Sequence, residues 1–485
     1  MFSDRAADVH RERHVNDTPV IPALAGTPTP TVPSTHWGVF GVASIAVFLV
    51  SIDTTVLFAA FGALRAGFPG SSATDLSWVL NAYTVVYAAL LVPAGRLADT
   101  HGRKRIFQLG LMLFLVASAA CGAATSVGML VAARVLQAIG AALLTPSSLA
   151  LVLGAFPVER RAIAVSLWGA VGGLAAALGP SVGSGVVDAL GWRWAFFLNL
   201  PLGLLAWWHG RRRLTEWRSL DHQAPLDVPG IALLIAGVGA LAFSVVQSEA
   251  LGWRSPTVLG AMAAGLIALL IFVGWARRTA HPAVDLSLFA DPTYRYVNLA
   301  TFAFGIAFAM MFFGYFFFLI QVWHYSLPKA GLAVTPGPLL VVPVAIAAGR
   351  LAARVGHRPL LVAGGLLYAA GGLWLYLRAG TQPDFLGTWL PGLMLTGTAV
   401  GMVLPSLSGA AVARLPPGRF GIGSAVNQAV RQMGGVLGVA ATVALVGHAS
   451  PQLADFQHLY AAHIALALLT ALLCLRVDTR PISRR

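Results

Sequence analysis

The sequence is dominated by long apolar runs separated by short polar stretches. Each run is about 20 residues long, which is enough to cross a bilayer as an α-helix. The predicted spans lie at 38–62, 76–95, 106–125, 129–152, 164–187, 194–210, 229–247, 257–276, 296–320, 333–349, 360–378, 387–411, 422–446 and 458–476. The pattern therefore predicts an all-α polytopic membrane protein with fourteen transmembrane spans.

Composition and charge support this interpretation. Charged residues make up 10% of the chain, against roughly 25% in soluble proteins. Most of the 32 Lys and Arg fall in the tails and in the loops on one side of the predicted membrane. The other side holds Arg65, Arg193, Arg254, Lys329 and Arg378. Because basic loops stay in the cytosol, we expect both termini to be cytosolic. The net charge of +14 then reflects topology, and we expect no nucleic-acid partner.

A polar turn occurs twice. Gly95–Arg105 lies between two apolar runs, and five of its residues are Arg, Lys or His, so it cannot lie in hydrocarbon. Gly349–Arg358 repeats its Gly, Arg, Leu, Ala and second Gly at the same spacing, with Ala353 in place of Asp99. A duplicated turn of this kind predicts two homologous halves, as in many transporters.

The register of the two turns predicts the domain organisation. They follow the second and the tenth predicted spans, so two extra spans separate the halves. We predict a disordered cytosolic tail (1–36), a six-helix bundle (37–214), linkers with two inserted helices (215–292), a second six-helix bundle (293–476) and a basic cytosolic tail (477–485). Residues 1–36 contain no signal peptide, so we expect the first span to target the chain to the membrane.

Two charges lie inside the predicted spans of the first half. A guanidinium at membrane depth costs about 2.5 kcal/mol or more unless it is paired or hydrated, so Arg134 should face the bundle interior. Its expected partners are Asp53, Gln137 or a backbone carbonyl. Asp53 is the only acid well inside a predicted span, and we expect it to carry a proton, with Arg134 opposing protonation. A permanent structural pair, and direct binding of a cationic substrate by Asp53, remain alternatives.

Further polar and aromatic positions are candidates for a substrate cavity. Phe304, Phe308 and Phe312 share one helical face, which would suit an apolar or cationic ligand; a lipid-facing or packed surface is the alternative. The tentative cavity residues are Asn81, Tyr83, Gln137, Phe304, Phe308, Phe312, Asn427 and Arg431.

Two backbone features are candidates for gates. Gly179, Pro180 and Gly183 lie in the span 164–187, where small residues permit close helix packing and proline bends the helix; plain packing is the alternative. The opening turn is the predicted cytosolic gate, with Asp99 pairing with a neighbouring cation and a helix N-terminus when the protein faces outward; a solvated loop is the alternative. The gate residues are Gly95, Arg96, Asp99, Gly102, Arg103 and Lys104.

With these motifs, residues 37–476 resemble the major facilitator superfamily, and more narrowly its fourteen-span drug:proton antiporters. Gly95–Arg105 matches the pattern G-x-L-a-D-r-x-G-r-[KR]-[KR] except at Thr100. Arg134–Gly140 matches R-x-x-Q-G-x-G except at Ala138, and Leu178–Ser184 matches l-G-P-x-x-G-G except at Ser184. Gly191–Pro201 is similar to the outer loop of the group. The first-span pattern matches only in part, because Phe58 replaces its asparagine and Gly62 its proline.

The resemblance implies a major facilitator fold and proton-driven export, by alternating access, of a small apolar or cationic compound such as a drug, antibiotic or metabolite. A proton-coupled importer of an organic anion, using Arg134 and Arg431 as a clamp, is the alternative. A sensor or assembly partner that does not transport is a third class, disfavoured because the embedded charges are present.

Nothing in the sequence indicates an enzyme. No nucleophile with a base, metal-ligand cluster or phosphate loop stands out, so we expect no cofactor and no metal. The expected partners are a small-molecule substrate, protons and the lipid bilayer, for a monomer in the cell membrane.

Overall fold

The computed structural model describes residues 35–216, 226–415, 419–447 and 451–479. Most of the two predicted tails and part of the linker after 215 lie outside the described residues. All regular structure in the described part is helical.

The helices follow the predicted apolar runs closely. The first half contains α1 (Thr35–Gly67), α2 (Ala73–His101), α3 (Arg103–Gly122), α4 (Val127–Ala155), α5 (Val158–Leu190), α6 (Trp194–Phe197) and α7 (Asn199–Arg213). Then come α8 (Val228–Leu251), α9 (Pro256–Ala276) and the short η1 (Leu286–Ala290). The second half contains α10 (Pro292–Gln321), α11 (Leu327–Val334), α12 (Pro336–Val355), α13 (Arg358–Arg378), η2 (Phe385–Trp389), α14 (Leu390–Val412), α15 (Phe420–Val446) and α16 (Leu453–Cys474).

Thirteen helical segments of the described chain are long and apolar enough to cross a membrane. The predicted span 194–210 differs, because it is divided at Leu198 into α6 and α7. At 15 residues, α7 is roughly 22 Å long, short of a hydrocarbon core of about 30 Å. This division has a consequence for the site described below, because it places Asn199 at a helix start inside the bundle.

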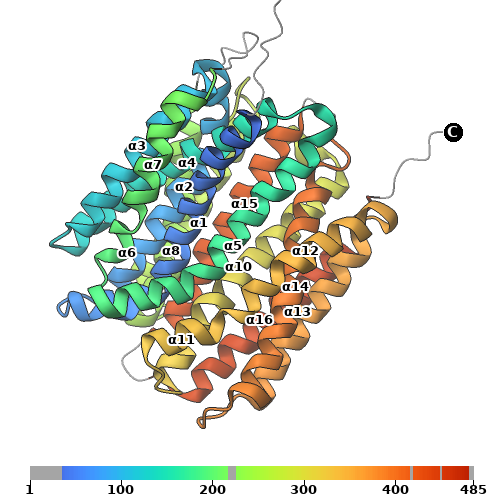
Figure 1. The fold of residues 1–485 in the computed structure, drawn as a ribbon. Helices are drawn as coiled ribbons and strands as arrows, with labels where there is room; N and C mark the ends of the chain where they lie inside the picture. The colour runs from blue at the N-terminus through green and yellow to red at the C-terminus, as the bar shows by residue number, and fades with distance from the viewer. Residues whose placement is uncertain (1–34, 217–225, 416–418, 448–450, 480–485) are drawn as a thin grey trace, which may run out of the picture.

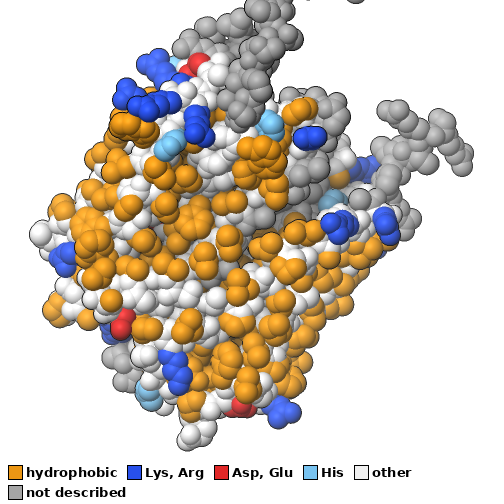
Figure 2. Space-filling view, viewed as in Figure 1, with side chains coloured by type: hydrophobic (Ala, Val, Ile, Leu, Met, Phe, Trp, Pro, Cys, Tyr) orange, Lys and Arg blue, Asp and Glu red, His pale blue; other side chains and the backbone are white. Residues whose placement is uncertain are grey.

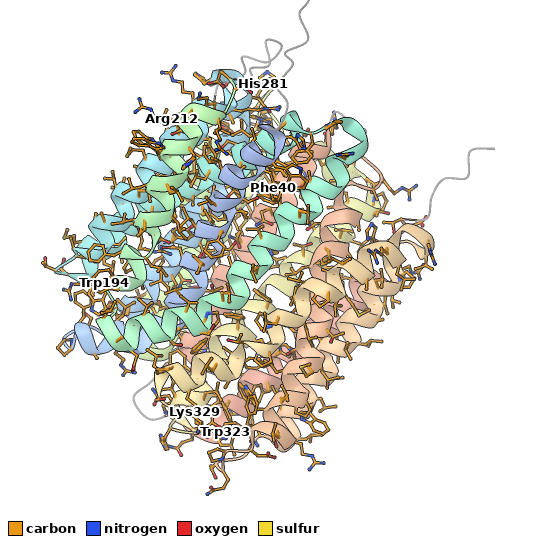
Figure 3. The ribbon with its side chains drawn as sticks, in the orientation of Figure 1. Phe40, Trp194, Arg212, His281, Trp323 and Lys329 are labelled. Carbon is orange, nitrogen blue, oxygen red and sulfur yellow. The ribbon has the colours of Figure 1, made fainter. Side chains whose placement is uncertain are left out.

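The helices run side by side, with α1–α4 and α7 on one side of the view and α12–α14 and α16 on the other (Figure 1). Apolar side chains form a broad belt around the visible face, and most Arg and Lys lie towards its two ends (Figure 2). We call the end that holds Arg212 and His281 the basic end, and the end that holds Trp194, Trp323 and Lys329 the opposite end (Figure 3).

The predicted inserted helices form a hairpin. Helix α8 packs on α9 and also contacts both α2 and α15, where Val85, Val238, Ala242 and Val436 form an apolar cluster. Asp227 closes the base of the hairpin by accepting hydrogen bonds from the Gly230 and Ala283 amides and the Trp275 indole. The hairpin therefore covers the line along which α2 and α15 meet.

Both polar turns have the same backbone form. Gly102 has φ +106° and Gly356 has φ +79°, a region that favours glycine. Each glycine amide donates to the carbonyl four residues earlier, at Ala98 and Ala352. The second glycine of the repeat is therefore required by the reversal between two consecutive helices.

Candidate functional site

A large cavity, with a volume of about 2690 Å³, lies between the helices of the two halves. Its wall is formed by residues of α1, α2, α4, α5, α10, α12, α14 and α15. The lining reaches the basic end, where Arg96, Asp99, His281, Arg350 and Arg419 surround the mouth. The cavity is therefore accessible from the basic end.

Aromatic packing closes the cavity towards the opposite end. Phe61 of α1 packs edge-on against Phe313 of α10, with ring centroids 5.1 Å apart. Phe58 contacts Phe312 and Phe313 at 5.6 and 5.4 Å. Because α1 and α10 belong to different halves, this contact holds the halves together at the opposite end while the basic end stays open.

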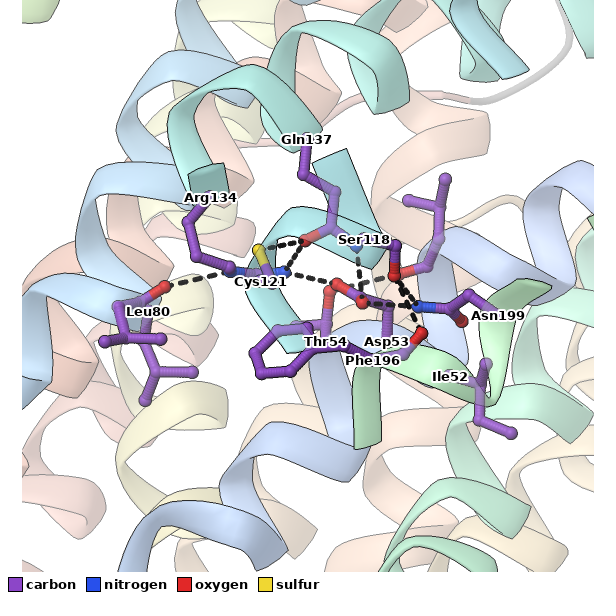
Figure 4. Close-up of polar contacts among 12 residues, drawn as sticks. Ile52, Asp53, Thr54, Leu80, Ser118, Cys121, Arg134, Gln137, Phe196 and Asn199 are labelled. Carbon is purple, nitrogen blue, oxygen red and sulfur yellow. Dashed lines mark hydrogen bonds and ion pairs between the residues drawn. The ribbon is translucent and has the colours of Figure 1, made fainter. Parts of the chain in front are cut away.

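The two embedded charges of the first half form one buried network beside the cavity (Figure 4). Arg134 and Asp53 are each 1% exposed, and Arg134 Nη1 lies 2.6 Å from Asp53 Oδ2. Asp53 Oδ1 accepts from Gln137 Nε2 at 2.9 Å and from Asn199 Nδ2 at 2.8 Å. Every hydrogen-bond partner of the carboxylate is thus a donor, which fits its ionised, acceptor-only form.

The guanidinium of Arg134 is also held on several sides. Its Nε donates to the Val79 carbonyl at 3.0 Å, and Nη1 donates to Gln137 Oε1 at 2.6 Å. The Tyr83 ring lies 3.9 Å from its Cζ, in a cation–π contact. Arg134 lines the cavity, whereas Asp53 lies behind it and is not part of the wall.

Asn199 belongs to this network but was not predicted from the sequence as a site residue. Its Nδ2 also donates to Ser118 Oγ at 3.0 Å, and Ser118 donates to the Phe196 carbonyl at 2.8 Å. Because the helix is broken at Leu198, the Phe196 carbonyl is free to accept from Ser118. The break also lets the Asn199 side chain reach Asp53. The available signal was that Asn199 lies in the Gly191–Pro201 segment, which resembles the outer loop of the drug:proton antiporters.

The small residues of α5 pack against the segment that carries Asp53. A Cβ on Gly179 would meet the side chain of Thr55, and one on Gly183 would meet Val56. On its other side, α5 meets α11 of the second half, where a Cβ on Gly331 would strike Ser184 and the Pro180 carbonyl. The Gly-Pro segment is therefore enclosed between the Asp53 helix and the other half.

The predicted cavity residues fall into two groups. The cavity wall includes Tyr83, Phe308, Phe312 and Arg431. In this conformation it does not include the other four, which are Asn81, Gln137, Phe304 and Asn427.

Each of the four has a different environment. Phe304 is fully buried against Tyr368, with ring centroids 5.0 Å apart. Asn427 donates to Asn298 Oδ1 and Thr301 Oγ1. Gln137 belongs to the Asp53 network, and Asn81 is buried without a hydrogen-bond partner among the described residues. Helical periodicity places residues on a face, but the neighbouring helices decide whether that face meets a cavity.

At the basic end, the opening turn connects several elements. Asp99 pairs with Arg103 at 2.9 Å on the surface. Glu216 accepts from the Lys104 and Arg105 amides, both at 3.0 Å. In this conformation it is therefore Glu216, not Asp99, that occupies the N-terminus of α3, where a carboxylate is favoured.

Two more contacts anchor the same turn. Lys104 Nζ donates to the Arg211 carbonyl at the end of α7, and Arg96 donates to the His281 carbonyl in the linker after α9. In the second copy Ala353 replaces the acid, and burial lowers the pKa of His357 below its usual value. With His neutral, both turns have a net charge of +3, but the second has three charged groups where the first has five.

Comparison with known proteins agrees with this architecture. The family model described as Major Facilitator Superfamily matches residues 43–439, with a second match over 297–485. The chain belongs to the major facilitator superfamily. It is a multi-pass membrane transporter with the helical fold of that superfamily.

Relatives within the superfamily include resistance proteins. The chain is 34% identical over 441 residues to the puromycin resistance protein pur8 of Streptomyces alboniger, covering 89% of this chain and 85% of that one. It is 31% identical over 400 residues to the multidrug resistance protein Stp of Mycobacterium tuberculosis (strain CDC 1551 / Oshkosh), covering 82% and 73%. A solved D-xylose-proton symporter has a similar fold, with a TM-score of 0.65 at 15% identity, covering 93% of this chain and 99% of that one.

Proposed function

We propose that this major facilitator exports drug-like compounds in exchange for protons, by alternating access. Its relatives are named as multidrug and puromycin resistance proteins, and export of such compounds is one way for a transporter to give resistance. The observation that carries the proton coupling is the buried Asp53–Arg134 pair directly behind the cavity wall. We place the protein in the cell membrane as a monomer, with the basic end in the cytosol.

With that orientation the structure corresponds to an inward-facing state. The cavity meets the cytosol at the basic end, and the Phe58, Phe61, Phe312 and Phe313 rings close it on the outside. Export requires these rings to separate while the mouth closes. In a transporter of this kind the same helices adopt two conformations, and ligand binding changes the relative populations of the two conformations.

The proton step in this proposal takes place at Asp53. In the inward-facing state its carboxylate is ionised and accepts from Arg134, Gln137 and Asn199, as expected after a proton has left to the cytosol. When a proton binds from outside, the carboxylate loses its charge and Arg134 loses its counter-ion. A guanidinium without a partner at membrane depth is costly in free energy. Protonation of Asp53 therefore favours a conformation in which Arg134 is hydrated or has another partner.

Helix α5 provides a route from this pair to the other half. Its Gly179 and Gly183 pack on Thr55 and Val56, next to Asp53, while Ser184 packs on Gly331 of α11. A small displacement of the Asp53 helix therefore presses on α5, and α5 presses on the second half. Tightly packed helices transmit such shifts because their interfaces are not continuously deformable.

The decisive experiment is Asp53→Asn in sealed vesicles, with uptake of a resistance substrate driven by an imposed proton gradient. We expect accumulation to fall to the level seen without a gradient. Asp188→Asn is the matched control, because Asp188 is an exposed acid near the opposite end, and it should transport normally. Full gradient-driven accumulation by the Asp53 variant would place the coupling elsewhere.

A further inference from the structure

Arg431 is a second embedded guanidinium, and its charge has no partner among the described residues. It lies on α15 and lines the cavity. The ion pairs formed by the described residues involve other groups. Its hydrogen bond goes from Nη2 to Gln428 Oε1, at 2.7 Å. Gln428 lies three residues earlier on the same helix, so this bond does not join α15 to another element.

The acids of the cavity do not compensate this charge. The two acidic residues of its lining are Asp99 and Asp285, and both lie at the mouth. Asp99 is paired with Arg103. Deeper in the cavity, Arg134 is neutralised by Asp53, whose carboxylate is fully occupied and does not reach the wall. Counting the described residues, the deep part of the cavity therefore carries one uncompensated positive charge, that of Arg431.

The surroundings of Arg431 suit an acidic group attached to an apolar body. Tyr87 is near enough to Arg431 for the two groups to interact electrostatically, and its hydroxyl lies 2.9 Å from Thr145 Oγ1 in a hydrogen bond. Tyr87 and Thr145 both line the cavity and add hydroxyl groups to its wall. On α10, Phe308 and Phe312 have ring centroids 5.8 Å apart and form an apolar part of the same wall.

We infer that the cavity binds amphiphilic organic anions, with a carboxylate or similar acidic group on Arg431 and the apolar body against Phe308 and Phe312. This inference rests on the proposed export function and names its substrate class. A guanidinium binds a carboxylate through two parallel hydrogen bonds, and burial away from water strengthens the contact. A cationic compound would meet a like charge in the same place, so the inference favours an anionic substrate over a cationic one.

The inference is tested by equilibrium binding of three matched probes to the purified protein in detergent, measured by calorimetry. The probes are naphthylacetate, naphthylacetamide and naphthylethylammonium, which share a ring system and differ in charge. We expect the acid to bind about tenfold to a hundredfold more tightly than the amide, as for a charge-assisted hydrogen bond, and the ammonium compound to bind most weakly. Arg431→Gln should bring the ratio of acid to amide affinity close to one, and Arg431→Lys should keep part of the preference for the acid.

Arg350→Gln is the matched control, because it removes the same charge at the mouth of the same cavity. It should keep the preference for the acid. The inference fails if the wild-type protein does not bind the acid or binds the ammonium compound as tightly, or if Arg350→Gln has the same effect as Arg431→Gln. It also fails if folded, monodisperse Arg431→Gln protein keeps the wild-type ratio of acid to amide.

This outcome is independent of proton coupling, because binding is measured without a gradient. An intact preference for the acid, together with gradient-independent transport, would contradict only the proposed coupling. Proton-driven export without that preference would contradict only the substrate class.

Discussion

At the scale of single residues, the site depends on matching donors to a buried acid. Asp53 accepts from Arg134, Gln137 and Asn199, and Arg134 in turn donates to the Val79 carbonyl. Charged groups are tolerated inside a membrane protein when their hydrogen bonds are made within the bundle. The network therefore stabilises one arrangement of α1, α4 and α7 while the carboxylate is ionised.

Replacing Arg134 by lysine tests whether the planar guanidinium is needed. Lysine keeps the charge but has one nitrogen, so it cannot donate to Asp53 and to the Val79 carbonyl in the same geometry. We expect the Arg134→Lys variant to reach the membrane normally and to transport about tenfold more slowly or worse. Initial transport rates normalised to protein amount provide the measurement.

Arg193→Lys is a suitable control for this change. Arg193 lies at the opposite end, where it stacks on Trp192 and donates to the Ala124 carbonyl, away from the cavity wall. It should transport close to the wild-type rate. Full activity of Arg134→Lys would show that charge alone is sufficient at this position.

At the scale of the elements, close packing of α5 connects the Asp53 segment to the second half. The Gly-Pro motif is a packing feature in this structure, since Gly179 and Gly183 face α1 without room for a side chain. The same contacts support a role as a gate, because α5 also meets α11. The two interpretations of this motif are therefore compatible.

Alanine at Gly183 should disturb this packing measurably. Its Cβ would lie 2.8 Å from both methyl groups of Val56, so α5 and α1 must separate. Overpacking of this kind typically costs about 1–3 kcal/mol. We expect Gly183→Ala to lower the Tm of the purified protein and to slow transport.

Gly185→Ala, two residues along the same helix, separates packing from helix propensity. Open space surrounds Gly185, and alanine favours the helix by up to about 1 kcal/mol relative to glycine. That variant should be as stable as the wild type or more so. Equal effects of the two substitutions on Tm would argue against a close α1–α5 contact.

At the scale of the whole molecule, the two ends differ in how the halves meet. The basic end is open to the cavity, and the opposite end is sealed by aromatic rings from α1 and α10. The inserted hairpin packs along α2 and α15, so the cavity is covered on that side. Access to the cavity in this conformation is therefore from one end.

Thiol labelling tests both the openness and the proposed orientation. The native cysteines Cys121 and Cys474 are buried and should react slowly. Ala345→Cys places a thiol on the cavity wall, and Thr381→Cys places one on an exposed loop at the opposite end. With a membrane-impermeant reagent, we expect inverted vesicles to label the first thiol and intact cells to label the second. The reverse pattern would mean that the basic end faces outward.

The sequence alone determined the helical fold and the polar turns. Apolar runs of the length of a bilayer can satisfy their backbone only as helices, so the spans followed from composition. The duplicated Gly, Arg, Leu, Ala and Gly pattern predicted a repeated turn, and both Gly102 and Gly356 have positive φ. The cost of an embedded guanidinium predicted an interior partner for Arg134, and Asp53 and Gln137 were both among the partners considered.

The tertiary structure decided what depends on several helices at once. Asn199 reaches Asp53 because α6 and α7 are separated at Leu198, and no periodicity in the sequence encodes that break. Phe304 turns towards Tyr368 while Phe308 and Phe312 meet the cavity, although all three share a helical face. Within the part of the chain that the structure describes, Arg431 has no acidic partner, because the deep carboxylate of Asp53 is already paired with Arg134. A sequence pattern orients each side chain on its own helix, whereas its partner is set by the neighbouring helices and by the space between them.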